Sequence, residues 1–181
     1  VYNADITAQI LHRQIAPHVL GKDPRNVASL VTGAIEREYK FLGSYVCRAA
    51  TGVDTALWDL LGKMEGKSVA ELWGGKPKKI PVYGSSMKRD AALYVDDNGC
   101  YSVAKAVEMA RFFVGEGVDI FEEPCRFWDI EDTAKVRKAV NPMGLRVAGG
   151  EQDCIMAQWK RIVNIGMVDI AQPDICYIGG F

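Results

Sequence analysis

The sequence predicts an α/β protein whose first part is helical and whose second part alternates strands with helices. From residue 80 onward, short apolar runs alternate with segments of helical spacing, which is the signature of parallel βα units. These runs lack the polar–apolar alternation of a half-exposed strand, as expected for strands covered on both faces. A stretch rich in Gly, Pro and Lys at residues 74–79 separates the two parts. We therefore expect one partial domain over residues 1–79 and a second over residues 80–181.

Three helices are expected in the first part. Apolar residues recur at helical spacing between residues 6 and 15, and again between residues 27 and 35. The third helix is the clearest, because its apolar residues form one stripe and Gly66 then ends it. The members of this stripe are Val53, Leu57, Leu60, Leu61 and Met64.

The second part contains five expected strands and three expected helices. The strands fall at residues 80–83, 93–95, 118–121, 145–148 and 168–171, and the helices at 102–115, 132–140 and 155–165. Only seven residues lie between the end of the first strand near Ser85 and the start of the second near Leu93, whereas neighbouring parallel strands need a crossover of about a dozen residues or more. Either this pair is antiparallel or a βα unit is missing within residues 88–93, and we favour the missing unit.

Composition argues against several classes of protein. The 22 Lys and Arg against 23 Asp and Glu give a net charge of −1, which is unlike a nucleic-acid binder. No apolar run is long enough for a membrane span, and residues 1–5 lack the basic and apolar regions of a signal peptide. The five cysteines are scattered and odd in number, which favours reduced thiols in the cytoplasm. We therefore expect a cytoplasmic protein without nucleic-acid or membrane partners.

A carboxylate follows each of the last four expected strands. These acids are Asp96, Glu122, Glu151 and Asp174, and their spacings of 26, 29 and 23 residues each match about one βα repeat. The carboxyl ends of parallel strands meet at one edge of a sheet or barrel, where such folds place their active sites. We therefore expect these acids to lie side by side. Their neighbours Asp97 and Glu123 are expected to point elsewhere.

The proposed ligand set consists of oxygen atoms alone. Converging carboxylates repel each other unless a cation lies among them, and oxygen ligands favour Mg²⁺, with Mn²⁺ as the alternative. No His or Cys stands in register with the acids, which argues against zinc. The competing interpretation treats these acids as helix N-caps. We disfavour it because Glu122 and Glu151 are poor N-cap types, and we expect Asn98 to hold Asp96 in place.

The motifs at these positions resemble those of the enolase superfamily, in its mandelate racemase-like branch of the mandelate racemase/muconate lactonizing enzymes. They are Val-Asp-Thr-Ala-Leu-Trp-Asp-Leu-Leu-Gly-Lys at 53–63, Leu-Trp-Gly-Gly at 72–75, Pro-Val-Tyr at 81–83, Val-Asp-Asp-Asn-Gly at 95–99, Phe-Glu-Glu-Pro at 121–124, Ala-Gly-Gly-Glu at 148–151, Gln-Pro-Asp at 172–174 and Gly-Gly at 179–180. The resemblance implies a modified (β/α)8 TIM barrel with an α+β capping domain, both present only in part. It also implies that Asp96, Glu122 and Glu151 bind Mg²⁺.

The resemblance further implies abstraction of the proton α to a carboxylate, with the metal stabilising the enediolate. In this branch the Asp at the position of Asp174 orients a catalytic His on the following strand. The expected reaction is dehydration of an acid sugar. The alternatives are a racemase or epimerase of a 2-hydroxy acid, and a catalytically silent relative or binding protein. The expected partners are a small-molecule carboxylate and further copies of the chain in a homo-oligomer.

The sequence departs from the family pattern in three places. The βα unit expected near residues 88–93 would carry the family's catalytic Lys motif. The His that would pair with Asp174, and the last two barrel strands, are not among the 181 residues. The first strands of the capping domain, whose loop closes over the substrate, are also missing. Because a barrel with five strands cannot close or bury its faces, we expect a whole protein of roughly twice this length.

Overall fold

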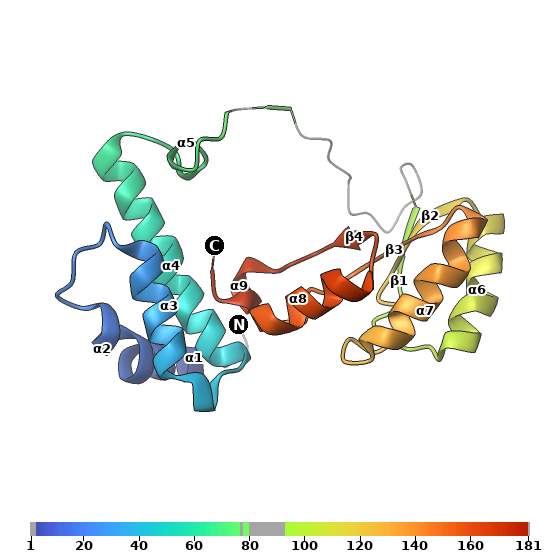
Figure 1. Cartoon of the computed structure of the whole chain (residues 1–181), viewed down its shortest axis with the longest axis horizontal. Helices are drawn as coiled ribbons and strands as arrows, with labels where there is room; N and C mark the ends of the chain where they lie inside the picture. Colours follow the sequence, from blue (N-terminus) through green and yellow to red (C-terminus); the bar gives the residue numbers. More distant parts are fainter. Residues whose placement is uncertain (1–2, 77, 80–92, 181) are drawn as a thin grey trace. The chain divides into compact units, whose positions relative to one another are not determined.

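The computed structural model describes residues 3–76, 78–79 and 93–180. The expected strand at 80–83 and most of the segment expected to lack a βα unit lie outside these residues. The chain divides into two compact units, one formed by Val1–Ile80 with Asp174–Phe181 and the other by Pro81–Pro173 (Figure 1). Each unit is described by itself. Among the described helices, none is both long and apolar enough to cross a membrane.

The first unit is built from helices. Its elements in chain order are α1 (Ala4–Ile10), the π-helix η1 (Leu11–Ile15), α2 (Ala16–Val19), α3 (Val27–Arg37), the 3-10 helix η2 (Tyr39–Phe41), α4 (Ser44–Glu65), α5 (Val69–Leu72) and α9 (Ile175–Ile178). The three expected helices are confirmed. The core forms where η1, α3 and the first half of α4 meet, around Ile15, Val31 and Ala50. Segments from both ends of the chain therefore belong to one unit.

Helix α4 differs from its expected form in extent and in its buried face. It begins at Ser44, nine residues before the predicted stripe, and ends as predicted at Gly66, which has a left-handed φ of 64°. The residues buried most deeply lie in its first half, whereas Leu60 and Met64 are 42% and 48% exposed. The stripe is thus only partly a core face, because α3 and η1 cover the first half of α4.

The second unit is a parallel sheet with its connecting helices. The strands β1 (Leu93–Asp96), β2 (Val118–Glu122), β3 (Arg146–Gly149) and β4 (Ile170–Ala171) lie in the order β1-β2-β3-β4. They are joined by α6 (Val103–Gly115), α7 (Ile130–Val140) with the 3-10 helix η3 (Asn141–Met143), and α8 (Met156–Ile165). All three strand pairs are parallel, which confirms the βα interpretation. Figure 1 shows α6 and α7 together beside β1 and β2.

Aromatic and branched side chains fill the layer between the sheet and its helices. Phe121 and Val147 in the strands have no exposed surface, and Val136 and Val140 of α7 pack in the same cluster. The ring of Phe113 on α6 meets that of Phe121 edge-on, with centroids 5.2 Å apart. This packing fixes the strands against the helices and so fixes the positions of the residues at the strand ends.

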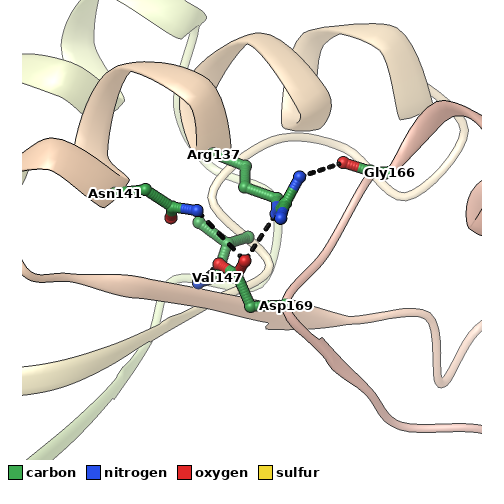
Figure 2. Close-up of polar contacts among 5 residues, drawn as sticks. All are labelled: Arg137, Asn141, Val147, Gly166 and Asp169. Atoms are coloured by element: carbon green, nitrogen blue, oxygen red, sulfur yellow. Dashed lines mark hydrogen bonds and ion pairs between the residues drawn. The ribbon is translucent and has the colours of Figure 1, made fainter.

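A cluster of charged and polar groups holds the amino-terminal ends of β3 and β4 (Figure 2). Arg137 donates from Nε to Asp169 Oδ1 (2.6 Å) and from Nη1 to the Gly166 carbonyl (3.0 Å). Asn141 Nδ2 also donates to Asp169 Oδ1 (3.1 Å), and the Val147 amide donates to Asp169 Oδ2 (2.9 Å). Burial alone would raise the pKa of Asp169, but these hydrogen bonds and the guanidinium charge hold it below its ordinary value. The cluster thus links α7, the end of α8, β3 and β4.

Asp169→Asn should lower the free energy of unfolding at pH 7 by about 1–3 kcal/mol, because the side chain is 15% exposed and its donors lose an anionic acceptor. A depressed folded-state pKa contributes stability above the unfolded value near 3.9, and this contribution is lost as pH falls through the folded value. The difference in free energy of unfolding between parent and variant, measured by urea unfolding, should therefore disappear below about pH 4.

The exposed Asp119 on β2 offers a matched control. Asp119→Asn should change stability by less than about 0.5 kcal/mol at either pH. If the difference in free energy of unfolding between the parent and Asp169→Asn stays constant from pH 7 to pH 3, the Asp169 carboxylate is not held in its charged form.

Candidate metal centre

Two of the predicted ligands end neighbouring strands. Asp96 is the last residue of β1 and Glu122 is the last residue of β2. The two are register partners in the parallel pair, and the Asp97 amide donates to the Glu122 carbonyl at 3.3 Å. Register partners project to the same face of a sheet. The fold therefore places these two carboxylates side by side, as the spacing in the sequence predicted.

The third predicted ligand follows β3 after a pair of glycines. An added Cβ at Gly150 would lie 2.5 Å from the ring of Trp159, and the φ of Gly150 is +105°. At Gly149, with a φ of +153°, the nearest atom to such a Cβ is Glu123 Cγ at 3.6 Å. The Gly-Gly pair thus allows the chain to turn tightly between two packed side chains. Glu151 is presented immediately after this turn.

An amide side chain holds each of the three predicted ligands. Asn98 donates from Nδ2 to Asp96 Oδ2 (3.0 Å) and from its backbone amide to Oδ1 (2.9 Å). Gln172 Nε2 donates to Glu122 Oε1 at 2.9 Å. Gln152 Nε2 donates to Glu151 Oε1 at 2.9 Å.

The sequence analysis named Asn98 but missed both glutamines. For Gln172 a signal existed, because it follows β4 at the same edge of the sheet. For Gln152 the signal was its place directly beside Glu151. These amide groups restrict the rotamers of the carboxylates they contact.

The charges of the three acids act on one another. Burial raises the pKa of Glu122, the negative charges of Asp96 and Glu151 raise it further, and the hydrogen bond from Gln172 opposes the rise. A carboxyl group is made less acidic when nearby carboxylates disfavour its own ionisation. The three predicted ligands therefore share one electrostatic environment.

Two further acids lie in the same environment, although one was expected to point away. Burial, followed by the charges of Glu151, Asp96, Glu122 and Asp153, raises the pKa of Glu123 to about 7. Burial also raises the pKa of Asp153 to about 6. Glu123 Oε1 and Asp153 Oδ2 are buried without a hydrogen-bond partner among the described residues. Negative charge is thus concentrated at this edge of the sheet beyond what the paired residues neutralise.

The donor set fits a hard divalent cation in its chemistry. The groups are carboxylate oxygens held by amides, and buried carboxylate oxygens stand without a donor. Within residues 3–76, 78–79 and 93–180, however, no three His, Cys, Asp or Glu side chains are arranged so that they could hold a metal ion. The acids are neighbours that repel one another rather than a closed three-ligand cage. A cation that binds here would have to draw their side chains together.

The fourth predicted residue, Asp174, lies in the other compact unit. It is the N-cap of α9, and its Oδ1 accepts a hydrogen bond from the Cys176 amide at 2.7 Å. The N-cap interpretation of the strand-end acids therefore describes Asp174. No such cap bond involves Asp96, Glu122 or Glu151 among the described helices. Asp174 thus belongs to the helical unit, whereas Asp96, Glu122 and Glu151 belong to the other unit.

Family models match nearly the whole chain. The mandelate racemase / muconate lactonizing enzyme N-terminal domain matches residues 3–74, and the enolase C-terminal domain-like model matches residues 84–181. The chain therefore belongs to the enolase superfamily, among the mandelate racemase/muconate lactonizing enzyme-like proteins. The parallel βα units are part of the TIM barrel of this family, and the predicted fold class is confirmed.

The chain is similar to curated enzymes that act on acid sugars and their lactones. It is 28% identical to D-galactarolactone cycloisomerase of Agrobacterium fabrum, over 90% of this chain and 56% of the relative. It is 24% identical to D-galactonate dehydratase of Ralstonia nicotianae, over 96% of this chain and 59% of the relative. The chain spans about half the length of the curated relatives it matches.

The alignment with the cycloisomerase extends over 218 positions, more than the 181 residues of the chain, so the relative has additional residues inside the matched region. Additional residues of this kind are what a missing βα unit requires. Its position within residues 88–93 stays a prediction.

Solved structures share the fold. A candidate racemase from Roseobacter denitrificans matches with a TM-score of 0.89 and 37% identity, covering 99% of this chain and 63% of that one. An enolase from Bradyrhizobium, crystallised with magnesium and mandelic acid, matches with a TM-score of 0.86 and 20% identity, covering 98% and 61%. At 20% identity the second match establishes the fold alone.

Gly150→Ala should destabilise the second unit by about 1–3 kcal/mol, because the new methyl group meets Trp159 and the positive φ disfavours a side chain. Near-UV circular dichroism of the tryptophans should change with it. The matched control is Gly115→Ala at the end of α6, where an added Cβ meets nothing within 4 Å. A neutral or stabilising effect is expected there. Equal stability of the two variants would contradict the tight turn before Glu151.

Proposed function

We propose that this protein uses Mg²⁺, bound by Asp96, Glu122 and Glu151, to abstract the proton α to a carboxylate, and that the reaction is dehydration of an acid sugar. The main observation behind this proposal is that Asp96 and Glu122 are register partners at the ends of neighbouring strands. The charge of Glu151 also contributes to the raised pKa of Glu122. A relative named as a D-galactonate dehydratase and a fold neighbour crystallised with magnesium support the proposal. Mn²⁺ would fit the same oxygen ligands.

The residues of this chain would supply the binding site for the metal and the substrate carboxylate. Asn98, Gln152 and Gln172 restrict the rotamers of the three acids, which would lower the entropic cost of ordering them around a cation. When bound, Mg²⁺ would neutralise the substrate carboxylate and the negative charge that develops as the α-proton leaves. Asp174 would orient the imidazole of the base and raise its basicity.

Two other functions use the same residues differently. A racemase or epimerase of a 2-hydroxy acid would need bases on both faces of the α-carbon and would lose no hydroxyl group. A catalytically silent relative or binding protein would keep the acids without the bases. The products distinguish a dehydratase from a racemase or epimerase. A dehydratase yields a 2-keto-3-deoxy acid, which reacts with semicarbazide, whereas the epimer that the other enzyme yields does not react. The likeness to a named dehydratase and a lactone cycloisomerase favours an acid sugar as substrate.

Glu122→Gln should weaken Mg²⁺ binding by roughly a hundredfold or more, because it removes one of three anionic ligands while keeping the side-chain shape. Isothermal titration with Mg²⁺ measures this directly and does not depend on turnover. Glu108→Gln on the exposed face of α6 is the control and should leave the affinity unchanged. Equal Mg²⁺ affinity of Glu122→Gln and the parent would remove Glu122 from the metal site.

Asp174→Asn should leave Mg²⁺ affinity within a factor of about two and lower kcat by roughly 10²–10⁴-fold, because it removes the charge that would hold the base. The measurement is semicarbazone formation from a panel of acid sugars by the whole protein. An unaffected kcat would exclude Asp174 from the reaction, and a lost Mg²⁺ affinity would place it in the metal site instead.

A further inference from the structure

The short helix α9 is held in place by α4. At four residues, α9 is too short to be stable by itself. Thr51 of α4 donates from Oγ1 to the Ile175 carbonyl at 2.9 Å. One turn earlier, the Arg48 guanidinium lies 4.0 Å from the centroid of the Tyr177 ring. A hydrogen bond and a cation–π contact thus join the same faces of the two helices.

The chain after α9 rests on the next turn of α4. The φ of Gly180 is +114°, and an added Cβ there would lie 2.5 Å from Asp54 Oδ2. A Cβ at Gly179 would lie 3.2 Å from Ile35 Cδ1. Asp54 and Thr51 are buried, with 2% and 5% of their surface exposed. Buried polar side chains are costly unless they serve a specific contact, and here both lie against the segment that follows Asp174.

These contacts fix the carboxylate of Asp174. Its Oδ1 accepts from the Cys176 amide, and its carbonyl accepts from the amides of Tyr177 (2.9 Å) and Ile178 (3.0 Å). The side chain of Asp174 therefore moves with α9. Since α9 is held by α4, the orientation of Asp174 depends on residues more than a hundred positions earlier, in the segment that the N-terminal domain model matches.

We propose that Arg48, Thr51 and Asp54 form a clamp on α9 and are positioning residues for Asp174. Through this clamp, these three residues set the rate of the reaction without themselves touching the substrate or the metal. The proposal rests on the role proposed for Asp174. It assigns a function to Asp54, the one clamp residue that lies within the sequence motif at residues 53–63.

The test compares Thr51→Val with Thr51→Ser, which keeps the hydroxyl, and with Thr55→Val on the exposed side of the same helix. The first readout is hydrogen exchange at the Cys176 amide, because that amide donates to the Asp174 carboxylate. Thr51→Val should speed this exchange roughly five- to tenfold, while Thr51→Ser and Thr55→Val leave it unchanged. Gly180→Ala provides a second disruption from the other side of the contact, and far-UV circular dichroism verifies folding.

The second readout is steady-state kinetics of the whole protein. Thr51→Val should lower kcat roughly five- to tenfold with KM and Mg²⁺ affinity unchanged, and Thr51→Ser should restore it. Faster exchange with an unchanged kcat, or an unchanged exchange rate, overturns the clamp. If Asp174→Asn retains full kcat, the role of Asp174 itself has failed, and the clamp proposal fails with it. If only Asp174→Asn is impaired, Asp174 keeps its role and the clamp alone is overturned.

Discussion

The register of β1 against β2 places two acidic side chains at neighbouring strand ends, and the candidate site depends on how their repulsion is offset. Asp96 and Glu122 are partners in the ladder and cannot separate without breaking it. Glu151 follows the turn at Gly149 and Gly150. The buried Glu123 is a fourth acid, and its pKa is raised by burial and by the charges of the other three. Such a group is tolerable only if protons, hydrogen-bond donors or a cation offset its charge. Burial and the neighbouring charges raise the pKa of both Glu122 and Glu123, which makes their protonation easier. Hydrogen bonds from the three amides offset part of the negative charge.

The two ends of the sheet treat acidic residues in opposite ways. At the amino-terminal end, Asp169 meets Arg137, Asn141 and a backbone amide, and its pKa falls. At the carboxyl end, burial and then the charges of neighbouring acids raise the pKa of Glu122. The first arrangement stabilises the fold because the charge is paired. The second leaves negative charge available to a positively charged ligand. In a (β/α)8 barrel the carboxyl-terminal face is expected to hold the active site, and the amino-terminal face to stabilise the fold.

The sequence could predict those parts of the structure that depend on periodicity. The βα alternation and the acid at each strand end both follow from spacing, and so did the parallel pairing that brings Asp96 beside Glu122. Contacts that depend on side-chain rotamers leave no periodic pattern in the sequence, so the glutamines that hold Glu122 and Glu151 were missed. Glu123, which was expected to point away from the other acids, occupies a left-handed conformation with φ 43° that periodicity does not predict. The exposed Leu60 and Met64 likewise depend on which segments cover α4, and periodicity does not state this.

The Gly-Gly pairs at 149–150 and 179–180 have the same structural role, one in each unit. In both, the backbone must adopt positive φ while passing within van der Waals distance of a packed side chain, Trp159 at Gly150 and Asp54 at Gly180. A side chain at either glycine would push the backbone away from that contact. One pair immediately precedes Glu151, and the other follows the helix that Asp174 caps. The glycines thus allow the acids to be placed by close backbone packing rather than by long, flexible loops, which keeps the entropic cost of ordering the site low.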